Sequence, residues 1–256
     1  MRPSSVLDAL RSYFGLAAFG VMGLAWTPPA LLLSALLPER AARAVGRAVV
    51  RRGFHAYLGM LRRLGACRFE LSELDSLQGQ GPMILAPNHP SLIDAVLVLS
   101  RLQGPACVMK AGLLGNPVLG AGARLAGYIP NDNLRSMIDR AVAELREGRS
   151  LLLFPEGTRS SAHPVGPMRG IVGLIARQAR VPVQTVLIEA DSSFLGKRWD
   201  LGEVPRLPIR YRVRLGRRFD PPANAQDFVQ ELDAYFHQAL GGAAAPPAPY
   251  DPPPRP

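Results

Sequence analysis

The chain has 256 residues, enough for one large α/β domain with a sizeable core and too few for two full domains with linkers. Apolar residues make up 48% of it and the mean hydropathy is +0.08, values that are high for an ordinary soluble enzyme and indicate a membrane contact. The formal net charge of +10 favours anionic partners. No helix-turn-helix pattern, zinc spacing or strand with interleaved aromatic residues indicates nucleic acid.

The basic residues are nearly all arginine, with lysine only at Lys110 and Lys197. Arginine binds phosphate with two parallel donors, whereas a GC-rich genome gives the same excess with no function attached. The two cysteines, Cys67 and Cys107, make neither a disulfide framework nor a zinc site and fit a reducing compartment. We expect no metal and no cofactor.

Residues 13–37 form an uncharged segment rich in Leu, Ala, Gly and Phe. A membrane-spanning helix needs about 20 such residues, so the length suffices. Pro28 and Pro29 interrupt the segment, and proline removes a helical hydrogen bond. Two structures fit this pattern: a single kinked span, or a hairpin of two short helices that enters one leaflet and returns.

Arginines are concentrated after the segment, which predicts by the positive-inside rule that the bulk of the chain lies in the cytoplasm at the inner membrane. They are Arg40, Arg43, Arg47, Arg51 and Arg52, whereas only Arg2 and Arg11 precede it. A cleaved signal peptide and a buried core helix are the alternatives, but the apolar run is long for either. Residues 40–64 predict a basic amphipathic helix, which either lies on anionic lipid or has an ordinary solvated face. Residues 1–64 are thus expected to form a membrane-associated helical segment.

Strands and helices alternate over residues 65–240, which predicts an α/β domain with a mixed, largely parallel sheet flanked by helices. The expected strands are 67–71, 82–86, 106–109, 128–130, 151–154, 183–188 and 209–215. The expected helices are 91–102, 116–126, 134–145, 170–179 and 224–240, with Asn133 and Gly148 at the ends of the third. Alternating Arg210, Arg212 and Arg214 suggest either an edge strand protected by charge or a face toward lipid phosphates. Residues 241–256 are rich in Ala and Pro and are expected to be disordered.

Two polar segments each follow an apolar strand, the place where α/β sheets bind ligands. The first is Asn88-His89-Pro90-Ser91-Leu92-Ile93-Asp94. An imidazole suits proton removal near neutral pH, and it needs a carboxylate to hold its other nitrogen, which Asp94 can supply. Taken alone, such a pair is more often structural.

The second segment is Phe154-Pro155-Glu156-Gly157-Thr158-Arg159-Ser160. Gly157 permits a tight turn, Arg159 matches phosphate, and Glu156 can bind either Arg159 or an acceptor hydroxyl. The alternative is that this segment is only a surface turn with a weak ion pair.

Together the two segments resemble the glycerophospholipid (lysophospholipid, 1-acylglycerol-3-phosphate) acyltransferase family. Its Asn-His-x-x-x-x-Asp motif is matched by Asn88, His89 and Asp94, and its Phe-Pro-Glu-Gly-Thr-Arg-Ser motif by every residue of 154–160. Weaker blocks at 127–131 and 181–186 agree in order, and the resemblance covers about residues 40–218.

The resemblance implies that His89 acts as general base, oriented by Asp94, in acyl transfer from acyl-CoA or acyl carrier protein to the free hydroxyl of a lysolipid. It implies that Glu156, Gly157, Thr158 and Arg159 bind the substrate, with Asn88 and Ser160 in support. Main-chain N–H groups near Pro90–Leu92 are candidates for stabilising the oxyanion. A Ser91 nucleophile is the covalent alternative, although no Gly-x-Ser-x-Gly sequence occurs.

One position departs from the family. Asn131 stands where the family usually has an arginine that binds glycerol phosphate, and a neutral amide does not replace a guanidinium there. The segment then either serves only to cap the next helix, through Asp132 and Asn133, or accompanies a different acceptor such as an aminolipid, a glycolipid or a polyene-type lipid. A non-catalytic lipid-binding protein is the remaining alternative. Gly120-Ala121-Gly122 resembles the start of a dinucleotide fingerprint but lacks its sixth-position glycine, and His55, His163 and His237 have no partners at ligand spacing.

Overall fold

The structure is a computed structural model that describes residues 3–160, 162 and 164–241. His163 and the predicted tail from residue 242 onward lie outside the described residues. The helices are α1 (Pro3–Leu36), α2 (Glu39–Arg63), α3 (Asp94–Leu99), α4 (Gly120–Leu125), α5 (Leu134–Arg146), α6 (Ile171–Ala179) and α7 (Ala225–Leu240), with 3-10 helices η1 (Ser72–Leu77) and η2 (Ala111–Gly115). The strands are β1 (Cys67–Glu70), β2 (Ile84–Pro87), β3 (Ala106–Met109), β4 (Ile129–Pro130), β5 (Leu151–Leu152), β6 (Val183–Ala190) and β7 (Ile209–Phe219).

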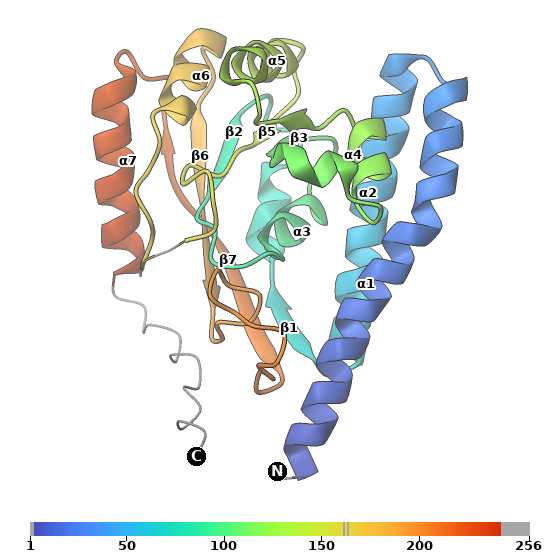
Figure 1. Cartoon of the computed structure of the whole chain (residues 1–256). Coiled ribbons are helices and arrows are strands. Elements are labelled where there is room, and N and C mark those ends of the chain that lie inside the picture. The colour runs from blue at the N-terminus through green and yellow to red at the C-terminus, as the bar shows by residue number, and fades with distance from the viewer. Residues whose placement is uncertain (1–2, 161, 163, 242–256) are drawn as a thin grey trace.

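The described residues form one seven-stranded sheet in the order β1-β7-β6-β2-β5-β3-β4. Only the β6–β7 pair is antiparallel among these strands, so the predicted mixed, largely parallel sheet is confirmed. Helices α5, α6 and α7 cover one face of the sheet, and α2 and α3 cover the other (Figure 1). The carboxyl ends of β2 and β5, where both motifs begin, therefore meet at one edge.

Alternation along β2 determines which way the first motif faces. Ile84 and Ala86 belong to the cluster under α5–α7, whereas Leu85 belongs to the cluster under α2 and α3. Because side chains in a strand alternate between faces, His89 continues the register of Leu85 and lies on the α2–α3 side.

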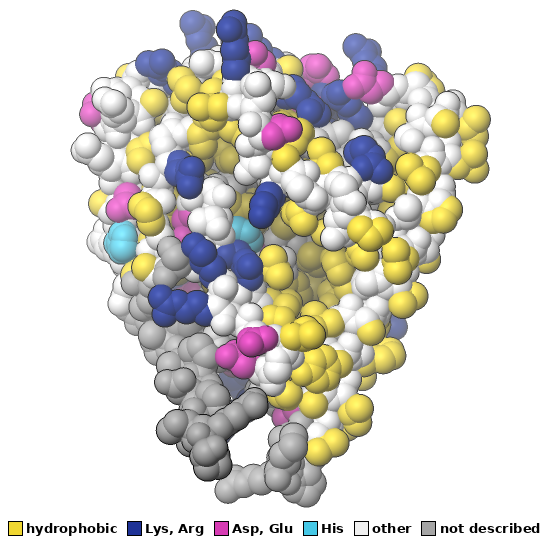
Figure 2. Space-filling model, viewed as in Figure 1, with side chains coloured by type: hydrophobic (Ala, Val, Ile, Leu, Met, Phe, Trp, Pro, Cys, Tyr) yellow, Lys and Arg dark blue, Asp and Glu magenta, His cyan; other side chains and the backbone are white. Residues whose placement is uncertain are grey.

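The apolar N-terminal segment forms one continuous helix, α1, that contains both Pro28 and Pro29, rather than a hairpin of two short helices. Its residues Val6–Leu36 have a mean hydropathy of 1.6 and only 6% of the apolar window is buried, so the helix is long and apolar enough to cross a membrane. Figure 2 shows hydrophobic side chains gathered on the surface over this helix. Its exposed apolar residues include Leu10, Phe14 and Val21. A buried core helix is thus excluded for this segment.

Part of α1 packs closely against the α/β domain. Ala30 is fully buried in a cluster with residues of α2 and α4, and a Cβ added at Gly23 would lie 2.4 Å from Val118. Small residues therefore let the backbone of α1 approach the segment before α4.

One expectation about the sheet is wrong. The arginine-bearing strand β7 is not an edge strand, because it lies between β1 and β6. Its charges are held by neighbouring strands instead: Arg212 pairs with Glu70 at 3.3 Å, and Arg214 with Glu189 at 3.1 Å. A long connection brings the chain back antiparallel into the sheet, which alternation of residue types does not reveal.

Candidate active site

Asn88 joins the end of β2 to β6. Its side-chain amide donates to the carbonyl of Ile188 at 2.9 Å, and its oxygen accepts from the N–H of Ile188 at 2.7 Å. The side chain is 2% exposed, so it extends the β2–β6 ladder by one rung beyond Pro87, the last paired residue of β2. The chain leaves the sheet at His89 with its direction fixed.

The His89 ring is held by a buried carboxylate. Its Nδ1 lies 2.8 Å from Oδ2 of Asp94, which also accepts the N–H of Ser91 at 2.7 Å. Because Oδ2 already accepts from Ser91, it serves as an acceptor, so Nδ1 of His89 carries the proton and Nε2 presents a lone pair. The ring also stacks on Phe154, with centroids 3.9 Å apart.

Burial distinguishes the two members of this pair. Asp94 is fully buried at the start of α3, and burial raises its pKa, although the hydrogen bond from His89 opposes the shift. The His89 side chain keeps 18% of its surface exposed. The imidazole is thus partly open at the surface, whereas its carboxylate partner is closed to water.

The second motif locks the backbone of His89. Oε1 of Glu156 accepts the N–H of His89 at 2.9 Å, and the N–H of Ser160 donates to the carbonyl of His89 at 2.7 Å. Glu156 is 3% exposed; Oε1 also accepts from the Ser160 hydroxyl and Oε2 from Gly166 N–H, both at 2.7 Å. Both carboxylate oxygens are therefore occupied by donors of the chain itself.

Gly157 is required by the turn that carries the motif. Its φ is +68°, and an added Cβ would lie 2.8 Å from Nε of Arg169. Arg169 in turn donates from Nε to the carbonyl of Glu156 at 3.2 Å. The motif itself gives no signal of Arg169, which comes nine residues after the motif ends.

Arg159 holds a loop beside the site. Its Nη1 donates to the carbonyls of Leu195 at 3.0 Å and Gly196 at 2.6 Å, while Thr158 is exposed. No pattern among residues 191–196 predicts that they lie at this edge. The other nitrogens of this half-buried side chain form no hydrogen bond with any residue that the structure describes.

Two further sequence expectations change here. The N–H of Ser91 is bound to Asp94 and that of Leu92 to the carbonyl of Leu195 at 3.1 Å, so neither is free to stabilise an oxyanion as predicted. The predicted helix over 91–102 is shorter, because residues 91–93 form the turn that brings Asp94 back to His89.

Asn131 lies at the same edge but is engaged within the chain. Its oxygen accepts the N–H of Ala111 at 3.1 Å. The next residues cap α5, with Asn133 accepting from Ser136 N–H at 2.9 Å, as the sequence predicted. Nothing at position 131 supplies a positive charge.

An imidazole backed by a buried carboxylate, beyond the carboxyl ends of parallel strands, defines a class: α/β proteins built for general-base chemistry at a sheet edge. Comparison with known proteins indicates the family. The profile of the Acyltransferase family matches residues 68–189 of this chain, a stretch that includes both motifs.

Individual relatives fit this assignment. The chain is 28% identical over 148 residues to the chloroplastic 1-acyl-sn-glycerol-3-phosphate acyltransferase BAT2 of Brassica napus, covering 54% of this chain and 43% of that protein. It is 28% identical over 182 residues to the lyso-ornithine lipid O-acyltransferase of Pseudomonas aeruginosa, covering 64% of this chain and 70% of that protein. The chain thus spans less than half the length of the plant relative.

The fold agrees with a solved structure. The 1-acyl-sn-glycerophosphate (LPA) acyltransferase PlsC of Thermotoga maritima superposes with a TM-score of 0.70 over 94% of this chain and 97% of that one, at 20% identity. The shared architecture includes the N-terminal helices as well as the sheet, since the coverage is nearly complete.

Proposed function

We propose that the protein transfers a fatty acyl group from a thioester, acyl-CoA or acyl carrier protein, to the free hydroxyl of a lysophospholipid. The acceptor we favour is 1-acylglycerol-3-phosphate, which would give phosphatidic acid. The observation that carries the proposal is the 2.8 Å contact between His89 Nδ1 and Asp94 Oδ2, with Nε2 left to act as base.

His89 and Asp94 together account for the proton transfers that this reaction needs. Nε2 of His89 removes the proton of the acceptor hydroxyl as that oxygen attacks the thioester carbonyl. The tetrahedral intermediate collapses, the C–S bond breaks, and the thiolate takes the proton from Nε2. Asp94 holds the imidazolium in place between the two steps.

A covalent intermediate on Ser91 finds little support. The Ser91 hydroxyl donates to the carbonyl of Phe194 at 3.1 Å, and the residue is 3% exposed. No hydrogen bond joins the Ser91 hydroxyl to the His89 ring, although both residues are described by the structure. Direct transfer is therefore the favoured mechanism.

Substrate binding is proposed for Arg159, with Gly157 and Thr158 forming the exposed side of its turn. A guanidinium matches the phosphate of the acceptor with two donors. Glu156 is proposed to act on the substrate only indirectly, since its oxygens already bind His89, Ser160 and Gly166.

Asn131 supports a second class of acceptor. The missing arginine and the relative that acylates a lyso-ornithine lipid both favour an aminolipid acceptor. The apolar helix α1 fits membrane association, and we propose the cytoplasmic side of the inner membrane because the arginines follow that helix.

The experiment is thiol release from acyl-CoA and from acyl carrier protein by purified enzyme in detergent, with a panel of lysolipids. Preference for 1-acylglycerol-3-phosphate supports the first acceptor, and preference for lyso-ornithine lipid supports the second. Absence of acceptor-dependent thiol release with every pair would refute acyl transfer. His89→Ala is the control for enzyme-independent hydrolysis.

A further inference from the structure

A cavity of about 1240 Å³ lies at the opposite end of the sheet from His89. Its lining includes Met83 just before β2, Pro105 just before β3 and Ser150 just before β5, which are the amino ends of these parallel strands. His89 follows the other end of β2, and no residue of the candidate active site lines the cavity. The volume is ample for an organic ligand of moderate size.

Positive charge dominates the lining, which includes six arginines and two glutamates. Three of the arginines are neutralised: Arg43, Arg47 and Arg149 form ion pairs with Glu39, Glu144 and Glu147. The other three, Arg40, Arg51 and Arg52, form no ion pair with any described residue. The cavity therefore carries an excess of positive charge that an anion would balance.

The paired arginines make one wall of the cavity rigid. Arg47 is 5% exposed; its Nε donates to the carbonyl of Ala126 at 2.8 Å and its Nη1 to that of Gly104 at 3.1 Å. Its Nη2 lies 3.0 Å from Oε2 of Glu144, which is itself 3% exposed. Helix α2 is thus fixed to α5 and to the start of β3, so this wall of the cavity is held in place by contacts within the chain.

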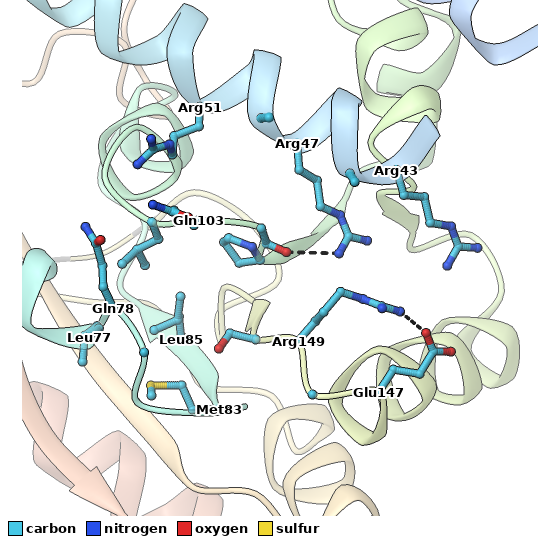
Figure 3. Close-up of a pocket in the computed structure, with 18 of the residues that line it drawn as sticks. Arg43, Arg47, Arg51, Leu77, Gln78, Met83, Leu85, Gln103, Glu147 and Arg149 are labelled. Carbon is cyan, nitrogen blue, oxygen red and sulfur yellow. Dashed lines mark hydrogen bonds and ion pairs between the residues drawn. The ribbon is translucent and has the colours of Figure 1, made fainter. Parts of the chain in front are cut away.

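The opposite wall is apolar. Figure 3 shows Arg43, Arg47 and Arg51 extending from α2, with Leu77, Met83 and Leu85 on a different side of the same cavity. Gly79, Gly81, Gly104 and Gly148 form turns in the lining, and a Cβ added at any of them would meet nothing within 4 Å. The cavity therefore combines a cationic wall, an apolar wall and open turns between them.

We propose that this cavity binds the phosphate of an organic phosphate ester, at a site separate from the active site. Arg51 and Arg52 supply planar donor pairs that match phosphate oxygens, and the apolar wall receives the carbon part of the ester. The ligand is either a soluble ester or the head group of an anionic phospholipid.

The test uses the full chain and compares two double variants. Arg51→Gln/Arg52→Gln removes two unpaired charges from the cavity. Arg62→Gln/Arg63→Gln removes the same charge from the exposed carboxyl end of α2, outside the cavity lining. The probes are sn-glycerol 3-phosphate added in detergent, and phosphatidylcholine vesicles with or without phosphatidylglycerol.

The measurement is the rise in Tm as each probe is added. We expect a saturable rise in the wild type, in His89→Ala and in Arg62→Gln/Arg63→Gln, and an apparent Kd at least about tenfold weaker in Arg51→Gln/Arg52→Gln. A rise with glycerol 3-phosphate identifies a soluble ester, and a rise only with phosphatidylglycerol identifies a lipid head group.

Two results would overturn the proposal. One is no saturable rise with either probe. The other is an equal rise in Arg51→Gln/Arg52→Gln, because that variant leaves the candidate active site unchanged and binding there would persist.

Discussion

The main-chain N–H of His89 donates to Oε1 of Glu156 at 2.9 Å, joining residues that lie 67 positions apart. The same carboxylate gathers Ser160 and Gly166, so the second motif is built around the first. The position of the imidazole thus depends on a charge that the substrate cannot easily reach, since Glu156 is 3% exposed.

Glu156→Gln should therefore lower kcat more than it raises KM for the acceptor. The amide keeps the size of the side chain but turns an NH₂ group toward an N–H donor, leaving a buried donor without an acceptor at a cost of about 1–3 kcal/mol. Steady-state kinetics with varied acceptor would measure the split. Glu231→Gln, on an exposed ion pair with Arg217, is the matched control. A pure rise in KM would instead favour direct substrate contact by Glu156.

Asp94→Asn should abolish most turnover without unfolding the protein. The amide can donate to Nδ1, which favours the wrong imidazole tautomer, so kcat should fall by about two to four orders of magnitude. Burial raises the pKa of Asp94 above its usual 3.8, meaning that the folded state disfavours the charged form. Replacing the charge removes this penalty, whereas an amide nitrogen that faces the N–H of Ser91 leaves a buried donor unpaired; the two effects oppose each other, so the variant should stay folded at pH 7. Turnover near the wild-type level would remove Asp94 from the mechanism.

His89→Ala should eliminate acceptor-dependent thiol release while the protein still fractionates with membranes. The substitution removes the base but leaves α1 and its exposed apolar face intact. Thiol release and membrane partition are measured on the same preparation. Retained turnover in this variant would rule out general-base catalysis by residue 89.

Gly157→Ala should be strongly destabilising, by about 1–3 kcal/mol or more, because φ is +68° and the new Cβ would collide with Arg169. Gly59→Ala is the opposite control. Gly59 lies inside α2 with open space where its Cβ would be, so alanine should stabilise by about 0.5–1 kcal/mol. Chemical denaturation measures the change in the free energy of unfolding of both variants. Equal changes would contradict the claim that the turn requires glycine at position 157.

Glu144→Gln should make the free energy of unfolding depend less on pH in the acid range. Burial alone would raise the pKa of Glu144, but the hydrogen bond from Arg149 and the charge of Arg47 outweigh it and lower the pKa. The folded state therefore binds this proton less readily than the unfolded chain, so the stabilisation is present above pH 4.5 and is lost as the pH falls through the folded pKa. The variant should lose about 3–5 kcal/mol near pH 7, since the buried Arg47 loses its partner. Denaturation between pH 3 and 7 measures both effects, and parallel curves would refute this account.

Local patterns predicted most of the elements, because helix caps and apolar runs act over a few residues. Asn133 capped its helix and β3 kept its predicted bounds, Ala106–Met109. The position of β7 in the sheet could not be predicted in this way, since strand order depends on which distant segment pairs with it. The cationic cavity could not be predicted for the same reason. Five of its six arginines lie on α2, but the turns before β2, β3 and β5 that complete its lining are distant from α2 in the sequence.

The site was predictable in its chemistry and less so in its geometry. His89 and Asp94 were expected to meet, and they do, at 2.8 Å. The carbonyls of Leu195 and Gly196 that receive Arg159 could not be foreseen, because main-chain acceptors leave no trace in residue identity.

The close packing of Gly23 and Ala30 has a consequence for anyone who wishes to trim this protein. Gly23 leaves no room for a side chain beside Val118, and Ala30 is buried against α2 and α4, so α1 is packed into the domain rather than attached as a separable anchor. Deleting it would strip the covering from those two helices and leave an insoluble remnant in place of a water-soluble enzyme.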